Sequence, residues 1–356
     1  MAPNLGRELL EFARTIRLGH TLFALPFALG TAFLAGTRDG VFPAAGVAGF
    51  AADVALLLAC MVTARTAAMG MNRVADAHLD AANPRTADRA IPAGRLRRRT
   101  ALALTLASGA LFIACAWGFY PMRGNPWPGI LAPPVLAVLY GYAYTKRFTA
   151  LSHWVLGLAL GLAPVGAWIA LRGEVGLFPV LVGGAVLFWT AGFDILYAMQ
   201  DETFDRAAGL KSIPALVGRP RAARLALGSH ILALALLAGA LAAVPECGVR
   251  SAERGVNGAP EALSKSPRVP VGQSGIRNPE SGVRNPEGGK AGPPWRSTPG
   301  GLAALAVVAV LVAVQHLRAR KGSAEKIGAA FFPLNAAVSI VWMAGAIFDA
   351  LRHVPR

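Results

Sequence analysis

Long apolar runs constrain the fold of this chain more than any other feature. Those long enough to cross a bilayer cover residues 17–36, 49–71, 100–120, 128–145, 152–171, 177–200, 221–244, 299–317 and 328–351. A membrane-spanning helix needs about 20 mainly apolar residues, and the strands of a β-barrel would instead alternate polar and apolar side chains. Only 15% of the residues are charged, against roughly a quarter in soluble domains. We therefore expect an all-α integral membrane protein, a bundle of nine transmembrane helices with cap loops on the cytoplasmic side.

The distribution of Lys and Arg between these runs predicts the orientation of the bundle. The tail before the first run and the loops after the second, fourth, sixth and eighth runs are rich in basic residues, whereas the alternate loops hold one each: Arg38, Arg123 and Arg172. Basic loops stay on the cytoplasmic side of a membrane. We expect a multi-pass protein of the inner (plasma) membrane, with its N-terminus and cap loops cytoplasmic and its C-terminus outside. The net charge of +16 thereby reflects topology, and we expect no nucleic-acid partner.

One segment, residues 245–298, departs from the apolar pattern. It is polar, rich in Gly, Pro and Ser, and contains the near-repeat "GIRNPES" and "GVRNPEG". Such a composition buries too little apolar surface to fold alone. We predict a disordered polar insertion between a membrane domain of residues 1–244, which holds spans 1–7 and both acidic motifs, and one of residues 299–356, which holds spans 8 and 9.

Two groups of oxygen-bearing side chains stand at the cytoplasmic ends of the second and sixth runs. The first group is Asn72, Asp76 and Asp80, and the second is Asp194, Asp201 and Asp205. Spacings of i, i+4, i+8 and of i, i+7, i+11 place each group on one helical face. Crowded carboxylates at a membrane boundary repel one another and are costly to desolvate. A hard cation such as Mg²⁺, bound by carboxylates and phosphate oxygens, removes that cost, so the pattern predicts a Mg²⁺-dependent diphosphate site.

Basic side chains near these groups fit the same interpretation. They are Arg85, Arg89, Lys146, Arg147 and Lys211, and they can neutralise phosphate charge. Tyr142 precedes Lys146 by one helical turn, so its ring would lie deeper in the membrane. That ring either stabilises a cation through its π face or belongs to an interfacial aromatic belt.

Three segments resemble the UbiA superfamily of intramembrane prenyltransferases. They are "NRVADAHLDAANPRTADRAIPAG", "YAYTKRFTALSHWVLGLALG" and "FDILYAMQDETFDRAAGLKSIPALVG". They are similar to the family's N-x-x-x-D-x-x-x-D, Y-x-x-x-K-R-x-T and D-x-x-Y-x-x-x-D-x-x-x-D motifs. The resemblance covers the chain outside 245–298 and implies a nine-helical fold.

This resemblance also implies a role for each site residue. Asn72, Asp76 and Asp80 would hold one Mg²⁺ on an isoprenyl diphosphate, and Asp201 with Asp205 would hold another, while Asp194 would line the site. Lys146, Arg147 and Lys211 would contact the diphosphate. Tyr142 would face the allylic carbon, and Arg17 would match a first-helix basic residue that contacts an aromatic acid.

The implied reaction transfers an isoprenyl chain from a polyprenyl diphosphate to the ring of a small aromatic acid in quinone biosynthesis. "NPRTADRAIPAG" and "KRFTALSHWVLG" resemble the 4-hydroxybenzoate branch of ubiquinone synthesis. They resemble still more a sister group of the futalosine route to menaquinone, whose acceptor is a 1,4-naphthoquinone carboxylic acid. Glu-Thr-Phe between Asp201 and Asp205 departs from the usual D-R-E-D-D form, so both acceptors stay open.

Two other classes compete with this interpretation. One is a haem-farnesylating or chlorophyll-type member of the superfamily. The other is a cation-coupled transporter that uses membrane carboxylates. Transporters place such groups near the bilayer midplane, often on broken helices. Here the acidic groups lie at the ends of runs on one side, which favours the enzyme.

Overall fold

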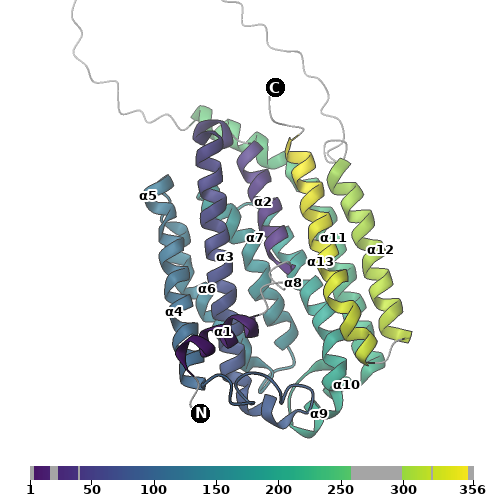
Figure 1. Ribbon diagram of the computed structural model, residues 1–356. Coiled ribbons are helices and arrows are strands. Elements are labelled where there is room, and N and C mark those ends of the chain that lie inside the picture. Colours follow the sequence, from purple (N-terminus) through teal and green to yellow (C-terminus); the bar gives the residue numbers. More distant parts are fainter. Residues whose placement is uncertain (1–3, 17–22, 39–40, 258–298, 322–323, 352–356) are drawn as a thin grey trace, which may run out of the picture.

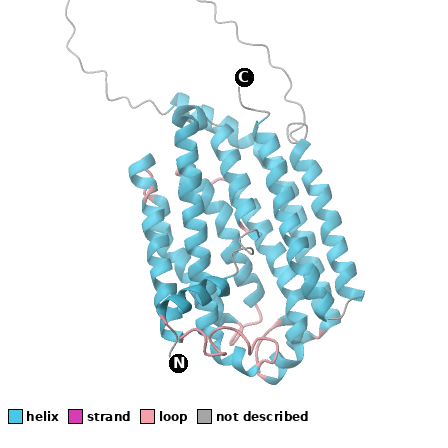
Figure 2. Ribbon diagram, viewed as in Figure 1, coloured by secondary structure: helices cyan, strands magenta, loops and turns pink. Residues whose placement is uncertain are grey.

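The computed structural model describes residues 4–16, 23–38, 41–257, 299–321 and 324–351. Within these ranges the chain forms a bundle of roughly parallel helices (Figures 1 and 2). The helices are α1 (Leu5–Ile16), α2 (Leu25–Arg38), α3 (Val41–Ala82), α4 (Arg98–Trp117), α5 (Phe119–Arg123), α6 (Trp127–Thr145), α7 (Ser152–Arg172), α8 (Leu177–Ala198), the 3₁₀ turn η2 (Met199–Asp201), α9 (Glu202–Ala207), α10 (Ile213–Val217), α11 (Arg219–Asn257), α12 (Pro299–Lys321) and α13 (Ala324–Leu351).

Seven described helical stretches are long and apolar enough to span a membrane. They are Gly46–Ala82, Arg98–Arg123, Ser152–Arg172, Leu177–Ala207, Arg219–Ala243, Pro299–Arg318 and Phe332–Leu351. The chain is thus an all-helical, multi-pass membrane protein, but the expected nine spans are not confirmed. The apolar part of α2, Leu25–Gly36, is about 18 Å long at 1.5 Å per residue. Helix α6 contains three prolines and three tyrosines, which lower its mean hydropathy.

Helix α8 occupies the middle of the bundle. It packs against α7 on one side and α11 on the other, while α2 lies between α7 and α13. Its residues read as an almost continuous apolar run, as expected of a helix covered by protein on several sides. The main core joins Phe27 of α2 with Trp189 of α8 and Trp342 of α13.

Two glycines set the distance between α7 and α8. A Cβ atom on Gly157 would lie 2.2 Å from the carbonyl oxygen of Leu187, and one on Gly161 would lie 2.4 Å from that of Gly183. The GxxxG pair therefore lets two backbones touch, as small residues do between membrane helices. This contact fixes the position of α7 along the axis of α8. The N-terminus of α7 and the C-terminus of α8 both lie at the charged end of the bundle.

We expect Gly157→Ala to destabilise the protein by about 1–3 kcal/mol, the usual cost of overpacking a tight contact. Gly166→Ala on the same helix is the matched control, because no heavy atom lies within 4 Å of its added Cβ. Thermal unfolding in detergent would compare the two variants. Equal losses in both would show that general helix strain, not the α7–α8 contact, is responsible.

Loops and short helices gather at one end of the bundle. The segment between α3 and α4, together with α9 and α10, lies at the lower end in Figure 1, and α1 crosses the bundle near it. Helix α11 is described as far as Asn257, so the helix continues past residue 245. The rest of the predicted insertion, 258–298, lies outside the described residues.

Candidate active site

The end of α3 determines where the first cap loop begins. The helix stops at Ala82, because the residue before Pro84 disfavours helical dihedrals. The side chain of Asn83 then accepts a hydrogen bond from the backbone N–H of Arg85 at 3.0 Å, a local turn typical of asparagine. This turn directs Arg85 back over the end of the bundle.

Asp76 is buried, with 3% of its surface exposed, and is held by two cations from the end of α6. Its Oδ2 accepts a hydrogen bond from Lys146 Nζ at 2.6 Å. Its Oδ1 accepts one from Arg147 Nη2 at 3.1 Å. The first acidic motif and the predicted basic pair therefore meet directly, although 70 residues separate Asp76 from Lys146.

Asp80 lies one turn further along the same face of α3. Its Oδ1 accepts a hydrogen bond from Arg89 Nη1 at 2.6 Å, and its Oδ2 is 3.9 Å from Arg73 Nη1. That Oδ2 is buried without a hydrogen-bond partner in the described chain. Leaving a buried carboxylate oxygen unsatisfied is costly, which marks Asp80 as a position for a ligand.

The second acidic motif lies within the helical stretch Leu177–Ala207, which a 3₁₀ turn interrupts. Asp194 is on α8, Asp201 ends the 3₁₀ turn and Asp205 is on α9. The 3₁₀ turn is wound more tightly than an α-helix, so the shared face of the three residues stays a prediction. All three residues nevertheless remain at the charged end of the bundle.

Asp201 is joined to the first cap loop by direct contacts. Its Oδ1 accepts hydrogen bonds from Arg85 Nε at 2.8 Å and from Asn83 Nδ2 at 3.1 Å, while Arg85 Nη2 binds Oδ2. The Arg85 guanidinium also lies over the ring of Tyr197 on α8. A bidentate arginine of this kind adds geometric specificity as well as attraction.

Shared cations connect the two acidic groups. Arg89 pairs with Asp80 and its charge also acts on Asp201, while the Lys146 ammonium that binds Asp76 also acts on Asp205. The backbone N–H of Lys211 donates to the carbonyl oxygen of Lys146 at 2.8 Å. The acidic residues of both motifs thus lie near Arg85, Arg89, Lys146 and Arg147, whereas Lys211 is exposed and contacts this region only through its backbone. Arg17 lies outside the described residues.

These donors fit a magnesium ion that is held jointly with a phosphate group. In the described part of the chain, no three His, Cys, Asp or Glu side chains lie close enough to bind a metal by themselves. Mg²⁺ usually takes only one or two carboxylates and completes its shell with waters and substrate phosphates. The orphaned Oδ2 of Asp80, with Asp76 and Asn72 on the same helix face, supplies oxygen donors of the required kind.

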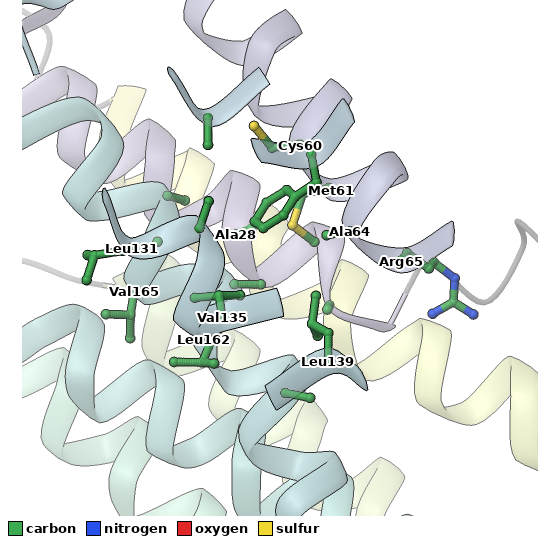
Figure 3. A pocket seen from close by; sticks show the side chains of 18 of the residues that line it. Ala28, Cys60, Met61, Ala64, Arg65, Leu131, Val135, Leu139, Leu162 and Val165 are labelled. Carbon is green, nitrogen blue, oxygen red and sulfur yellow. The ribbon is translucent and has the colours of Figure 1, made fainter. Parts of the chain in front are cut away.

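An apolar cavity of about 430 Å³ leads away from the charged residues. It is lined by α2, α3, α4, α6 and α7, and Figure 3 shows its wall around Met61, Leu139 and Leu162. Tyr142 lines this cavity and donates a hydrogen bond to the carbonyl oxygen of Ala68 at 3.3 Å. The phenol therefore faces the interior of the protein and not an interfacial aromatic belt.

Arg65 on α3 is a site residue that the motif search missed. Arg65 is one of the residues that line the cavity, and its guanidinium group carries the nitrogen atoms drawn in blue in Figure 3. Its Nε is buried without a hydrogen-bond partner in the described chain, and its charge acts on the Tyr142 hydroxyl. A lone Arg inside the apolar run 49–71 was the available signal, because charges within spans are usually functional.

A buried glutamate, Glu8, anchors α1 beside the site. Its carboxylate accepts hydrogen bonds from the backbone N–H, Nε and Nη2 of Arg97 at 2.8–2.9 Å and from Thr100 Oγ1 at 3.0 Å. Phe12 and Ile16 of α1 belong to the apolar cluster that supports the first cap loop. Helix α1 therefore holds the loop that carries Arg85 and Arg89.

The Glu8 contact predicts an acid-sensitive attachment of α1. Hydrogen bonds from Arg97 lower the pKa of Glu8 from 4.5 to about 2. A lowered folded-state pKa contributes stability that is complete above 4.5 and is lost as the pH falls towards about 2. The protection factors of the α1 amides, which correct for the intrinsic pH dependence of exchange, should fall across this interval, and Glu8→Gln should show low protection at every pH. Protection of α1 that stays constant in acid would contradict this role.

Relatives of known name are similar to this chain in sequence. A 4-hydroxybenzoate octaprenyltransferase from Azotobacter vinelandii is 34% identical over 186 residues, covering 52% of this chain and 61% of the relative. A protoheme IX farnesyltransferase from Korarchaeum cryptofilum is 30% identical over 203 residues, covering 55% and 66%. The chain thus matches somewhat less than two thirds of the length of these relatives.

Solved structures extend the similarity over nearly the whole chain. The apo structure of a UbiA homologue from Aeropyrum pernix K1 superposes with a TM-score of 0.65 at 29% identity, covering 94% of this chain and 98% of the homologue. A UbiA homologue from Archaeoglobus fulgidus bound to DMAPP and Mg²⁺ gives a TM-score of 0.50 at 21% identity, covering 72% and 91%. Residues 24–249, well over half of the chain, match the model of the UbiA prenyltransferase family. This chain belongs to the UbiA prenyltransferase family.

Proposed function

We propose that this protein is a Mg²⁺-dependent prenyltransferase that moves an isoprenyl chain from a polyprenyl diphosphate to the ring of a small aromatic acid. One observation carries the proposal: acidic and basic side chains from α3, α6, η2 and α9 converge at one end of a long apolar cavity. A diphosphate needs the charged end, and its isoprenyl chain needs the apolar one. Each CH₂ kept from water contributes about 0.8 kcal/mol.

The basic residues bind the diphosphate and neutralise its charge as it leaves. Lys146, Arg147, Arg85 and Arg89 each hold a carboxylate at the site, and the same N–H groups fit phosphate oxygens. Lys211 reaches the site through its backbone contact with Lys146. Cations fixed where negative charge develops lower the barrier to bond cleavage.

Asn72, Asp76 and Asp80 would hold one Mg²⁺, and Asp201 with Asp205 would hold a second. When bound, the metal ions stabilise the diphosphate as leaving group. The Archaeoglobus fulgidus homologue with DMAPP and Mg²⁺ supports this assignment by fold alone. The side chains of Asp76 and Asp201 also keep Lys146 and Arg85 directed at the same position.

Tyr142 stabilises the carbon from which the diphosphate departs. Its ring lines the cavity next to the charged end, and its hydroxyl is engaged by Ala68, so the π face is available to a cation. The C1–O bond of the allylic diphosphate breaks, and both electrons leave with the diphosphate. A ring carbon of the acceptor then bonds to C1, and the ring loses a proton to regain aromaticity.

Arg65 is our candidate for recognising the acceptor acid. It is a cation in an otherwise apolar wall, close to Tyr142 and with an unsatisfied Nε. A planar guanidinium matches a carboxylate in geometry and charge. Both 4-hydroxybenzoate and a 1,4-naphthoquinone carboxylic acid carry such a group, so Arg65 fits either one.

The proposed orientation places the site on the cytoplasmic face of the plasma membrane. The cap loop between α3 and α4 and the helix ends that flank it carry seven arginines between residues 73 and 99, which favours the cytoplasmic side. Diphosphate, the acid and Mg²⁺ would then enter from the cytoplasm while the isoprenyl chain enters from the bilayer.

A product assay tests the function. Membranes containing the protein would be incubated with Mg²⁺, geranyl diphosphate and either 4-hydroxybenzoate or 1,4-dihydroxy-6-naphthoate. Mg²⁺-dependent release of diphosphate together with a prenylated acid supports the proposal, and the acid that reacts identifies the branch. If neither acid is prenylated, the oxidised naphthoquinone acid is the next acceptor to assay. Ion flux in liposomes without any prenylated product would favour the transporter instead.

A further inference from the structure

His153, the second residue of α7, lies outside the acidic and basic motifs yet contacts the site directly. Its side chain is buried and its Nδ1 is 2.7 Å from Asp194 Oδ2. Its Nε2 is 3.3 Å from the backbone nitrogen of Ile213, the first residue of α10. One imidazole therefore connects three separate segments at the charged end of the bundle.

These two contacts determine where the ring carries its proton. A backbone N–H can only donate, so Nε2 of His153 accepts from Ile213. The neutral ring then has its hydrogen on Nδ1 and donates it to Asp194 Oδ2. The carboxylate of Asp194 is thereby held in one orientation, while its Oδ1 makes no hydrogen bond in the described chain.

Asp194 lies near Tyr142, the residue that the proposed function places against the reacting carbon. Its charge acts on the hydroxyl of Tyr142, as do those of Arg65 and Asp76. About a quarter of its side chain is exposed, and its Oδ2 is held by His153 and not by a Lys or Arg. Asp76, Asp80 and Asp201 are instead engaged by basic groups.

We infer that His153 is a positioning residue that holds Asp194 as the acceptor of the proton lost from the prenylated ring. Once the new carbon–carbon bond has formed, the ring carbon's hydrogen leaves as a proton to Asp194 Oδ1, and the electrons of the C–H bond restore the aromatic system. The diphosphate has already left with its own electron pair, so no other reactant is required. This inference rests on the proposed prenyl transfer.

Two conservative variants separate the two hydrogen bonds of His153. The amide nitrogen of His153→Asn occupies the place of Nδ1 and can still donate to Asp194, whereas His153→Gln places its amide oxygen near Nε2 and keeps the contact with Ile213. We expect the Asn variant to retain most of the wild-type kcat. The Gln and Leu variants should lose about 10–100-fold in kcat, the usual effect of removing a group that orients a reacting residue, with the KM for the diphosphate unchanged.

A kinetic isotope effect provides a readout that a structural role would not change. The acceptor would be deuterated at the ring position that is prenylated. If proton removal slows, the isotope effect on kcat should rise in His153→Gln and His153→Leu above that of the wild type and of His153→Asn. Asp194→Asn should show the same rise, and adding His153→Leu to it should cause no further loss.

Other results of these experiments would contradict either the role of His153 or the proposed function. Equal kcat values in the Asn and Gln variants, or an isotope effect that does not change as kcat falls, would overturn the positioning role. Should His153→Leu fail to fold by thermal unfolding, the Asn and Gln pair still decides the question. A wild-type protein that prenylates no aromatic acid would instead refute the proposed function itself.

Discussion

Replacing Asp76 by Asn should reduce prenyl transfer by about 100- to 1000-fold, a loss typical of removing one electrostatic contact to developing charge. Asp76 is buried and binds both Lys146 and Arg147. The substitution keeps the shape of the side chain but removes a proposed Mg²⁺ ligand and the charge that directs two diphosphate-binding cations. The rate of product formation should be measured over a Mg²⁺ titration, and higher Mg²⁺ should restore part of it.

Asp88→Asn is the matched control for this experiment. Asp88 lies in the cap loop that follows α3, but its side chain is 97% exposed and it pairs only with Arg95 at the surface. Its replacement should leave the rate and the Mg²⁺ dependence unchanged. Similar losses in both variants would indicate a general disturbance of the loop and would remove Asp76 from the proposed site.

Replacing Arg65 by Met should abolish the preference of the enzyme for an acid over its uncharged ester. Arg65 is a half-buried cation in an apolar wall, and its buried Nε has no hydrogen-bond partner in the described chain. Removing one partner of a buried charged contact costs about 2 kcal/mol or more, which is about 30-fold in affinity. We expect the KM for the acid to rise by at least this factor, while the KM for the isoprenyl diphosphate stays constant.

The methyl ester of the acceptor makes this test specific. Because the ester has no negative charge, Arg65→Met should use it as well as the wild type does, or better. Arg99→Met, at an exposed position at the start of α4, should change neither substrate. Equal losses for acid and ester would assign Arg65 a structural role and would leave acceptor recognition to other residues.

Most of the architecture follows from the sequence because apolar length and helical spacing are local properties. The seven described spans coincide with predicted runs, and Asp76 and Asp80 lie on one face of α3 as their spacing requires. The meeting of Asp76 with Lys146 was also predictable, since charges at the same end of a bundle attract one another. Run 128–145 was predicted as a span, but α6, which forms there and contains three prolines and three tyrosines, is not among the seven.

Contacts that depend on the packing between helices could not be predicted in this way. A 3₁₀ turn follows Ala198 and leads into the segment that carries Asp201 and Asp205. No residue pattern in the sequence predicts this turn. His153 reaches Asp194 only because Gly157 and Gly161 allow α7 and α8 to touch. A single histidine beside an apolar run carries no such information by itself.

The bond between Glu8 and Arg97 has a consequence for the order in which the protein is made. The two residues are 89 positions apart, and at about 5–20 residues per second the ribosome needs about 4–18 s to synthesise the intervening chain. During that interval Glu8 has no Arg97 partner, so α1 can reach its final position only after the start of α4 has been synthesised. Helix α1 is therefore translated before its binding partner but docks only after it, and its docking marks the completion of the first cap loop.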